Sequence, residues 1–156
     1  MTQDATFEDG RESPLNLGAQ DASDLQVISS LVQDSVFPIT EMRWQAKQHR
    51  FALLLNRFRW EDGARNRHAP ERVQSLLVLD NVVAVSSQGI DRSDTDLILS
   101  LLSVDFEPSE DGAGDLVLTL AGDGALRLRV EALDATLKDV TRPYVAPSGK
   151  APGHPE

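Results

Sequence analysis

The stretch RFALLLNRFRWE, residues 50–61, decides what kind of fold this chain can adopt. Its alternate positions form the two faces of a strand. One face is apolar except at its middle position and consists of Ala52, Leu54, Asn56, Phe58 and Trp60. The other face begins apolar and ends basic, with Phe51, Leu53, Leu55, Arg57 and Arg59. Because the first half is apolar on both faces, we expect a covered strand whose second half emerges into solvent.

Strands are also predicted on both sides of this segment, where apolar and polar residues alternate. The expected segments are a short strand at Val36 limited by Pro38, Met42–Trp44, Val73–Leu79, Val82–Ser87, Leu97–Glu107, Leu116–Ala121 and Ala125–Val130. Asp80-Asn81 and Gly122-Asp123-Gly124 consist of residue types that favour tight turns, so a hairpin is predicted at each of these places. Consecutive strands of this kind predict an antiparallel meander of about seven strands.

Two helices are predicted, one at each end of the meander. The first, near residues 23–35, has a capping box formed by Ser23 and Gln26. Its apolar residues recur at helical spacing, at Leu25, Ile28, Leu31 and Val32. Helical spacing returns near residues 131–140, at Ala132, Leu133, Thr136, Leu137 and Val140. A sheet with helices at its two ends is an α+β domain, and it can curl into a roll or a partly closed barrel, comparable in shape to pleckstrin-homology-like rolls.

The composition predicts one acidic globular domain. The chain has 156 residues, 25 Asp and Glu against 15 Lys and Arg, and a formal net charge of -10. We expect a single domain at residues 21–141 and disordered tails at residues 1–20 and 142–156, which are rich in polar residues, glycine and proline. The absence of cysteine excludes disulfides, zinc knuckles, iron–sulfur clusters and thiol nucleophiles. Without a long apolar run or a signal peptide, the expected location is cytoplasmic.

Signatures of catalysis and of cofactor binding are missing from the sequence. There is no Walker phosphate loop and no Gly-x-Ser-x-Gly elbow, and the turn at residues 122–124 lacks the third glycine and the helix of a dinucleotide fingerprint. The three histidines have no second ligand at metal spacing: His49, His68 and His154. Solvated surface groups are the best explanation of the 25 acids. We therefore expect no cofactor, no metal and no catalytic residue, and we leave enzymatic activity open.

The basic and aromatic segment Trp44–Arg67 is the candidate working surface. Residues 43–72 hold 8 basic and 3 acidic residues, whereas the rest of the chain is strongly acidic. The planar guanidinium group of arginine suits carboxylates and phosphates. The residues proposed to bind an anion or a partner are Asn56, Arg57, Arg59, Trp60 and Arg92. The alternative is that these arginines form ion pairs with the chain's own surplus acids.

Several segments of the chain resemble an alphaproteobacterial group of small cytoplasmic proteins, the domain-of-unknown-function family 2948. These segments are Asp21–Val36, Met42–Glu61, Val82–Arg92 and Leu101–Pro108. The strings NRFRW at residues 56–60 and QGIDR at residues 88–92 are the most specific. The resemblance covers residues 20–141 and implies no activity, cofactor or catalytic residue.

Three functions are compatible with these features. The favoured one is a non-catalytic binding or scaffold domain whose basic and aromatic surface meets an acidic protein partner or a second copy of the chain. The alternative is a small-anion-binding protein or an unfamiliar enzyme, with Arg57, Arg59 and Arg92 around one pocket. The third is nucleic-acid binding through residues 43–72, which the net charge of -10 disfavours because phosphates repel an acidic protein. No association with a membrane is expected.

Overall fold

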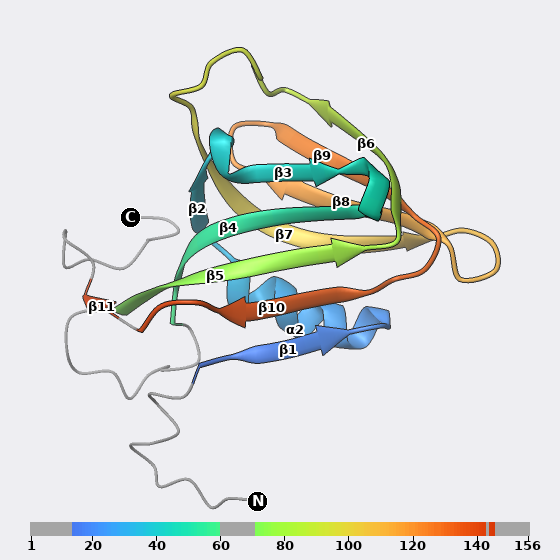
Figure 1. The fold of residues 1–156 in the computed structure, drawn as a ribbon, viewed down its shortest axis with the longest axis horizontal. Coiled ribbons are helices and arrows are strands. Elements are labelled where there is room, and N and C mark those ends of the chain that lie inside the picture. The colour runs from blue at the N-terminus through green and yellow to red at the C-terminus, as the bar shows by residue number, and fades with distance from the viewer. Residues whose placement is uncertain (1–13, 60–70, 143, 146–156) are drawn as a thin grey trace, which may run out of the picture.

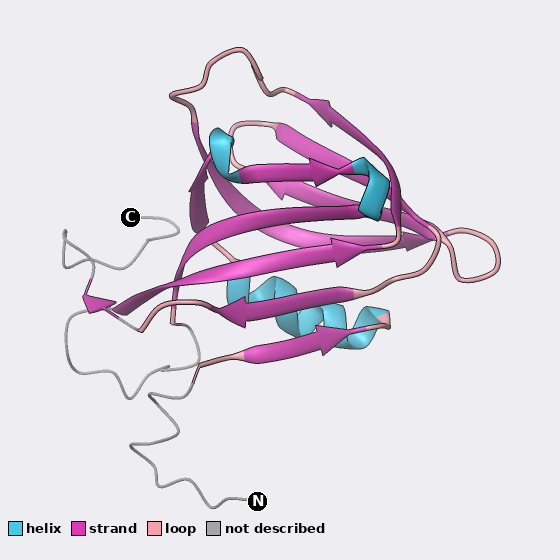
Figure 2. Cartoon of the chain, viewed as in Figure 1, coloured by secondary structure: helices cyan, strands magenta, loops and turns pink. Residues whose placement is uncertain are grey.

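The computed structural model of the protein describes residues 14–59, 71–142 and 144–145, which form an antiparallel sheet with a helix packed against it (Figures 1 and 2). In chain order the elements are β1 (Asn16–Ala19), α2 (Ala22–Val32), β2 (Ser35–Pro38), the 3-10 turn η1 (Ile39–Glu41), β3 (Met42–Gln45), the 3-10 turn η2 (Ala46–Gln48), β4 (Arg50–Phe58), β5 (Glu71–Asp80), β6 (Val82–Gln88), β7 (Ile98–Pro108), β8 (Gly114–Leu120), β9 (Gly124–Val130), β10 (Ala135–Asp139) and β11 (Tyr144–Val145). The antiparallel sheet and the amino-terminal helix are thereby confirmed. Residues 1–13 and 146–156 of the expected tails lie outside the described residues.

The order of the strands departs from a simple meander. Neighbours along the sheet are β1-β10-β5-β4-β2-β7-β8-β9-β6, with β3 beside β4 and β11 beside β5. The described residues form eleven strands, where the sequence pattern predicts about seven. The sheet is open, because its end strands β1 and β6 do not pair with each other. The pleckstrin-homology-like shape stays a prediction.

The core lies between the curled sheet and α2 (Figure 1). Strand β4 is covered as expected, since β5 pairs along its whole length and β2 and β3 pair with its other edge. Its core-facing leucines, Leu53 and Leu55, are completely buried, and burial of each stabilises the fold by roughly 1.5–3 kcal/mol. The helix contributes Leu25, Ile28 and Val32, whose helical spacing places them on the same buried face.

The expected carboxy-terminal helix is wrong, because residues 135–139 form strand β10. Ala135, Leu137 and Asp139 are buried, whereas Thr136 and Lys138 between them are more exposed. This is a period of two, which the apolar residues on either side of the segment conceal. The strand lies between β1 and β5 and pairs with both. Backbone pairing on two edges therefore favours the extended conformation over a short isolated helix.

The amino-terminal boundary also differs from the expectation. Asn16–Ala19, expected in the amino-terminal tail, form strand β1, which is too short for a clear sequence pattern. The helix then begins at Ala22, and its N-cap is Asp21 instead of Ser23. The Asp21 carboxylate accepts a hydrogen bond of 2.8 Å from the backbone N–H of Asp24.

The hairpin expected between residues 73 and 87 is wrong, whereas the hairpin around residues 122–124 is confirmed as β8 and β9. Strand β6 pairs with β9, and β5 pairs with β4, β10 and β11. Asn81 has a φ of 61° and turns the chain from one half of the sheet into the other. Its carbonyl accepts a hydrogen bond of 3.0 Å from Glu131, and the N–H of Asp80 donates one of 2.9 Å to Asp134. These contacts stabilise a corner between the two halves of the sheet, where the sequence predicts a two-residue hairpin turn.

Candidate functional site

Arg57 is the largest of the fully buried side chains and lies on the core-facing side of β4. Its Nη2 is 2.9 Å from Oδ1 of Asp139 on β10 and 3.2 Å from Oδ2. Its Nε donates to the hydroxyl of Ser75 at 2.8 Å, and that hydroxyl donates to Asp139 Oδ1 at 2.6 Å. Asp139 Oδ2 also accepts a hydrogen bond from the N–H of Leu15. The buried charge is therefore neutralised by a network that joins β4, β5 and β10 to the start of β1.

Arg59 also forms an ion pair with a carboxylate of the chain. It is 7% exposed and forms an ion pair with Glu71, whose backbone carbonyl accepts a hydrogen bond of 3.1 Å from the Arg59 N–H. The expectation that this half of the strand emerges into solvent is wrong. The reason is that carboxylates on other strands bring the matching charges, Glu71 from 12 positions away and Asp139 from 82.

Asn56 and Phe58 lie on the other face of β4. Asn56 is half-buried, and its backbone carbonyl and side-chain oxygen lie 3.3 and 3.4 Å from Nη1 of Arg72 on β5. The Arg72 guanidinium is stacked 3.9 Å from the centre of the Phe58 ring, a cation–π contact. Asn56 thus takes part in a cross-strand contact. Trp60, the next candidate along the strand, lies outside the described residues.

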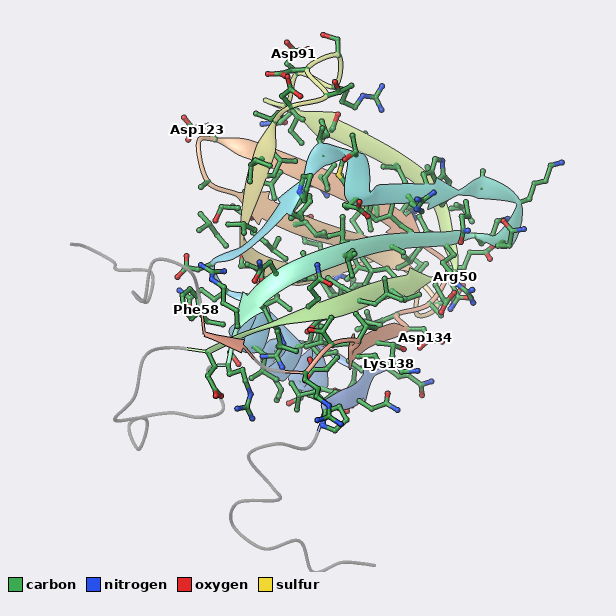
Figure 3. The ribbon with its side chains drawn as sticks, turned by 60° about the vertical axis from the view of Figure 1, so that its left-hand side comes forward. Arg50, Phe58, Asp91, Asp123, Asp134 and Lys138 are labelled. Carbon is green, nitrogen blue, oxygen red and sulfur yellow. The ribbon has the colours of Figure 1, made fainter. Side chains whose placement is uncertain are left out.

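Arg92 lies apart from the other candidates, in the exposed loop between β6 and β7. The neighbouring Asp91 carboxylate accepts hydrogen bonds from the hydroxyl and the N–H of Ser93, and these lower the pKa of Asp91. In Figure 3 Asp91 lies at the top of the molecule, well separated from Phe58 at the left-hand end of β4. The structure therefore does not bring Arg92 together with Arg57 and Arg59. A role of these residues in binding stays a prediction.

Among the described residues in and beside the basic and aromatic segment, strand β3 and the turn η2 carry most of the exposed side chains. Trp44 keeps 38% of its surface exposed, and Arg43 and Lys47 are exposed on either side of it. Neither cation forms an ion pair within the part of the chain that the structure describes. Arg50, in contrast, pairs with Asp80 at 2.8 Å. We call Arg43, Trp44 and Lys47 the β3 surface.

The β3 surface borders a free sheet edge. Among the described residues, strand β3 pairs with β4 alone and β6 pairs with β9 alone. The two free edges start from one point, where the N–H of Val82 donates a hydrogen bond of 2.9 Å to the carbonyl of His49. From this point β3 and β6 diverge, as Figure 1 shows. Sequence reasoning did not single out Arg43 or Lys47, and the only local signal is one aromatic among polar residues in the short string MRWQ.

Other regions provide weaker candidates. A shallow depression of about 590 Å³ lies beside the start of α2 and is lined by Asp21, Asn81, Phe106, Leu133 and Asp134, among others. On the far strands, Arg127 donates to Glu107 and Asp115, so its charge is already satisfied. No group of three or more potential metal ligands occurs within residues 14–59 and 71–142.

Comparisons with known proteins identify the family only. The model of the family described as "Protein of unknown function (DUF2948)" matches residues 15–154. No curated protein and no solved structure matches the chain. Within the described residues, no helix has the length and apolar composition that a membrane crossing requires. The alphaproteobacterial origin and the cytoplasmic location stay predictions.

Proposed function

Because the chain belongs to the DUF2948 family of proteins of unknown function, we propose from its geometry that it is a non-catalytic binding module for an acidic protein partner. The working surface is the β3 surface, which is exposed and lies at the start of the basic and aromatic segment found in the sequence. The observation that carries the proposal is the exposed Trp44 on β3, with Arg43 before it and Lys47 after it in the chain, neither of which forms an ion pair among the described residues.

The residue types on the β3 surface support binding. Tryptophan and arginine are enriched among the residues that dominate protein interfaces, because they offer a large contact area with polar groups at the rim. Trp44 is 38% exposed on a short strand, so part of its apolar surface stays in contact with water unless a partner covers it. The surface is therefore better suited to contact than to catalysis, which requires a desolvated reactive group.

The distribution of charge supports an acidic partner. The whole chain has a net charge of -10, yet the β3 surface is locally positive. Such a patch steers acidic molecules toward itself and disfavours basic ones. Arg57 and Arg59 are occupied by Asp139 and Glu71, so they leave this role to Arg43 and Lys47.

Selection of a randomised peptide library on the full chain tests the proposal. We expect enriched peptides to be rich in Asp and Glu, and the Arg43→Glu/Lys47→Glu variant to lose them. The control is Lys138→Glu/Arg142→Glu, which makes the same change in net charge at exposed cations outside the β3 surface. Enrichment without an acidic bias, or equal binding by the two variants, would contradict the proposal.

A further inference from the structure

Resting on the proposed function, we infer that the acidic partner binds as an extended strand added to the free edge of β3. Its apolar side chains face Trp44 and its acidic side chains face Arg43.

The strand order forms a ring that is interrupted between β3 and β6. Starting at β4, the pairs run through β2, β7, β8 and β9 to β6, while β3 lies on the same edge of β4 as β2 does. Pairing of β3 with β6 would complete this ring, but both strands have an unpaired edge among the described residues. A free edge presents backbone N–H and C=O groups to any extended segment. The free edge of β3 is therefore a place where an added strand can form hydrogen bonds.

The register of β3 fixes which way its side chains face. Trp44 lies opposite Phe51 and Met42 lies opposite Leu53, so both are on the core-facing side of the sheet. Arg43 lies opposite Ala52 on the outer side. Paired residues share a face and successive residues alternate, so an added strand needs alternating residues too. Apolar side chains beside Trp44 and acidic ones beside Arg43 satisfy both faces.

The exposure of core-facing residues supports a missing neighbour. Phe51 is 3% exposed, whereas Trp44 opposite it on the same face is 38% exposed. Across the opening, Val85 of β6 is only half-buried, although its partner Leu128 on β9 is completely buried. On both strands, burial falls at the free edge. An added strand would cover these apolar surfaces, which is the main source of binding free energy.

Charge distinguishes an acidic partner from a second copy of the chain. Antiparallel pairing of two β3 edges would bring the Arg43 and Lys47 cations of both copies onto one short ribbon. Like charges on neighbouring strands destabilise the pairing. An acidic strand removes this repulsion and adds cross-strand ion pairs. The occupant that fits is an extended acidic segment of another protein.

Backbone-methylated peptides test the binding mode. The probe is a short fluorescent peptide of alternating valine and glutamate, measured by anisotropy against the full chain. Successive N–H groups of a strand point to opposite edges. N-methylation of every valine therefore blocks one edge, and N-methylation of every glutamate blocks the other. We expect one methylated peptide to lose on the order of tenfold or more in affinity and the other to bind as the parent does.

Controls separate this inference from the proposed function. A peptide with the same residues in two blocks, valine then glutamate, keeps the charge but not the alternation, and we expect it to bind weakly. Equal binding by both methylated peptides and the block peptide would overturn the added strand while leaving the acidic partner in place. Binding of the parent peptide that Arg43→Glu/Lys47→Glu does not reduce would overturn both. A dimer of the free chain that the parent peptide disperses would assign the edge to a second copy and overturn the inference.

Discussion

At the scale of a single residue, Arg57 shows how a buried charge can be accommodated in the core of this sheet. Removing an arginine from water is costly, and a carboxylate and a hydroxyl must replace its hydration for the fold to hold. Asp139 and Ser75 do so at 2.9 and 2.8 Å from the guanidinium group, and the backbone carbonyl of Phe58 accepts from Nη1. The cluster also fixes the order of strands, because its members come from β4, β5 and β10.

Breaking this pair should be severely destabilising. Asp139→Ala leaves the Arg57 charge buried without its carboxylate, so we expect the free energy of unfolding to fall by about 3–5 kcal/mol. Urea denaturation followed by circular dichroism measures this. Replacing both partners, as in Arg57→Met/Asp139→Leu, should recover much of the loss because no buried charge is left. The exposed pair between Arg127 and Glu107 provides the control, and Glu107→Ala should leave the midpoint nearly unchanged. A double variant as unstable as Asp139→Ala would contradict this account.

At the scale of elements, a second set of ion pairs joins strands β7, β8 and β9 on their outer face. Arg127 of β9 lies 2.8 Å from Glu107 of β7 and 2.7 Å from Asp115 of β8. Arg129 lies 3.2 Å from the other oxygen of Asp115. The hydrogen bond from Arg127 is the main cause that lowers the pKa of Asp115 from its ordinary value of 3.8; burial opposes it, and the hydrogen bond from Arg129 lowers the pKa further.

The lowered pKa of Asp115 makes its contribution to stability depend on pH. The unfolded chain binds this proton more readily, so the ionised carboxylate stabilises the fold above the unfolded pKa of 3.8 and this contribution disappears as pH falls through the folded pKa. We expect Asp115→Asn to be less stable than the parent chain at neutral pH. The difference should shrink below about pH 4. Thermal melts of both proteins at a series of pH values measure it, and a difference that grows on acidification would be the wrong sign.

The elements also show which signals a sequence carries. Strands β4, β7, β8 and β9 were predictable because their apolar alternation is long and local. Strand β10 was not, because its five residues are extended only by pairing with β1 and β5. The candidate site follows the same division. The basic and aromatic character of the segment is local, but the burial of Arg57 depends on Asp139, which lies 82 positions away.

The whole molecule is an acidic protein whose described residues leave several strand edges unpaired, among them those of β3 and β6. An exposed strand edge can pair with the edge of another copy and cause aggregation. Natural proteins often prevent this pairing with charged side chains on the edge. Here Arg43 is on β3, but β6 carries no charged residue and no proline. The net charge of -10 makes copies repel one another at long range. This repulsion opposes self-association, so the edge stays available for a partner whose charge is complementary to the β3 surface. A neutral chain would lack this protection against self-association.

Hydrogen exchange tests whether the ring of strands is open in solution. Amides of β4 and β8, which are paired on both edges, should exchange slowest. From Ala84 to Gln88 the N–H groups of β6 alternate between β9 and the free edge, so protected and fast-exchanging amides should alternate along these residues, as measured by NMR. Uniform protection of β6 would mean that something already pairs with its outer edge. Alternating exchange along β6 would show that its outer edge is free. If the amides of β3 then gain protection when the valine–glutamate peptide is added, the new strand pairs with the free edge of β3.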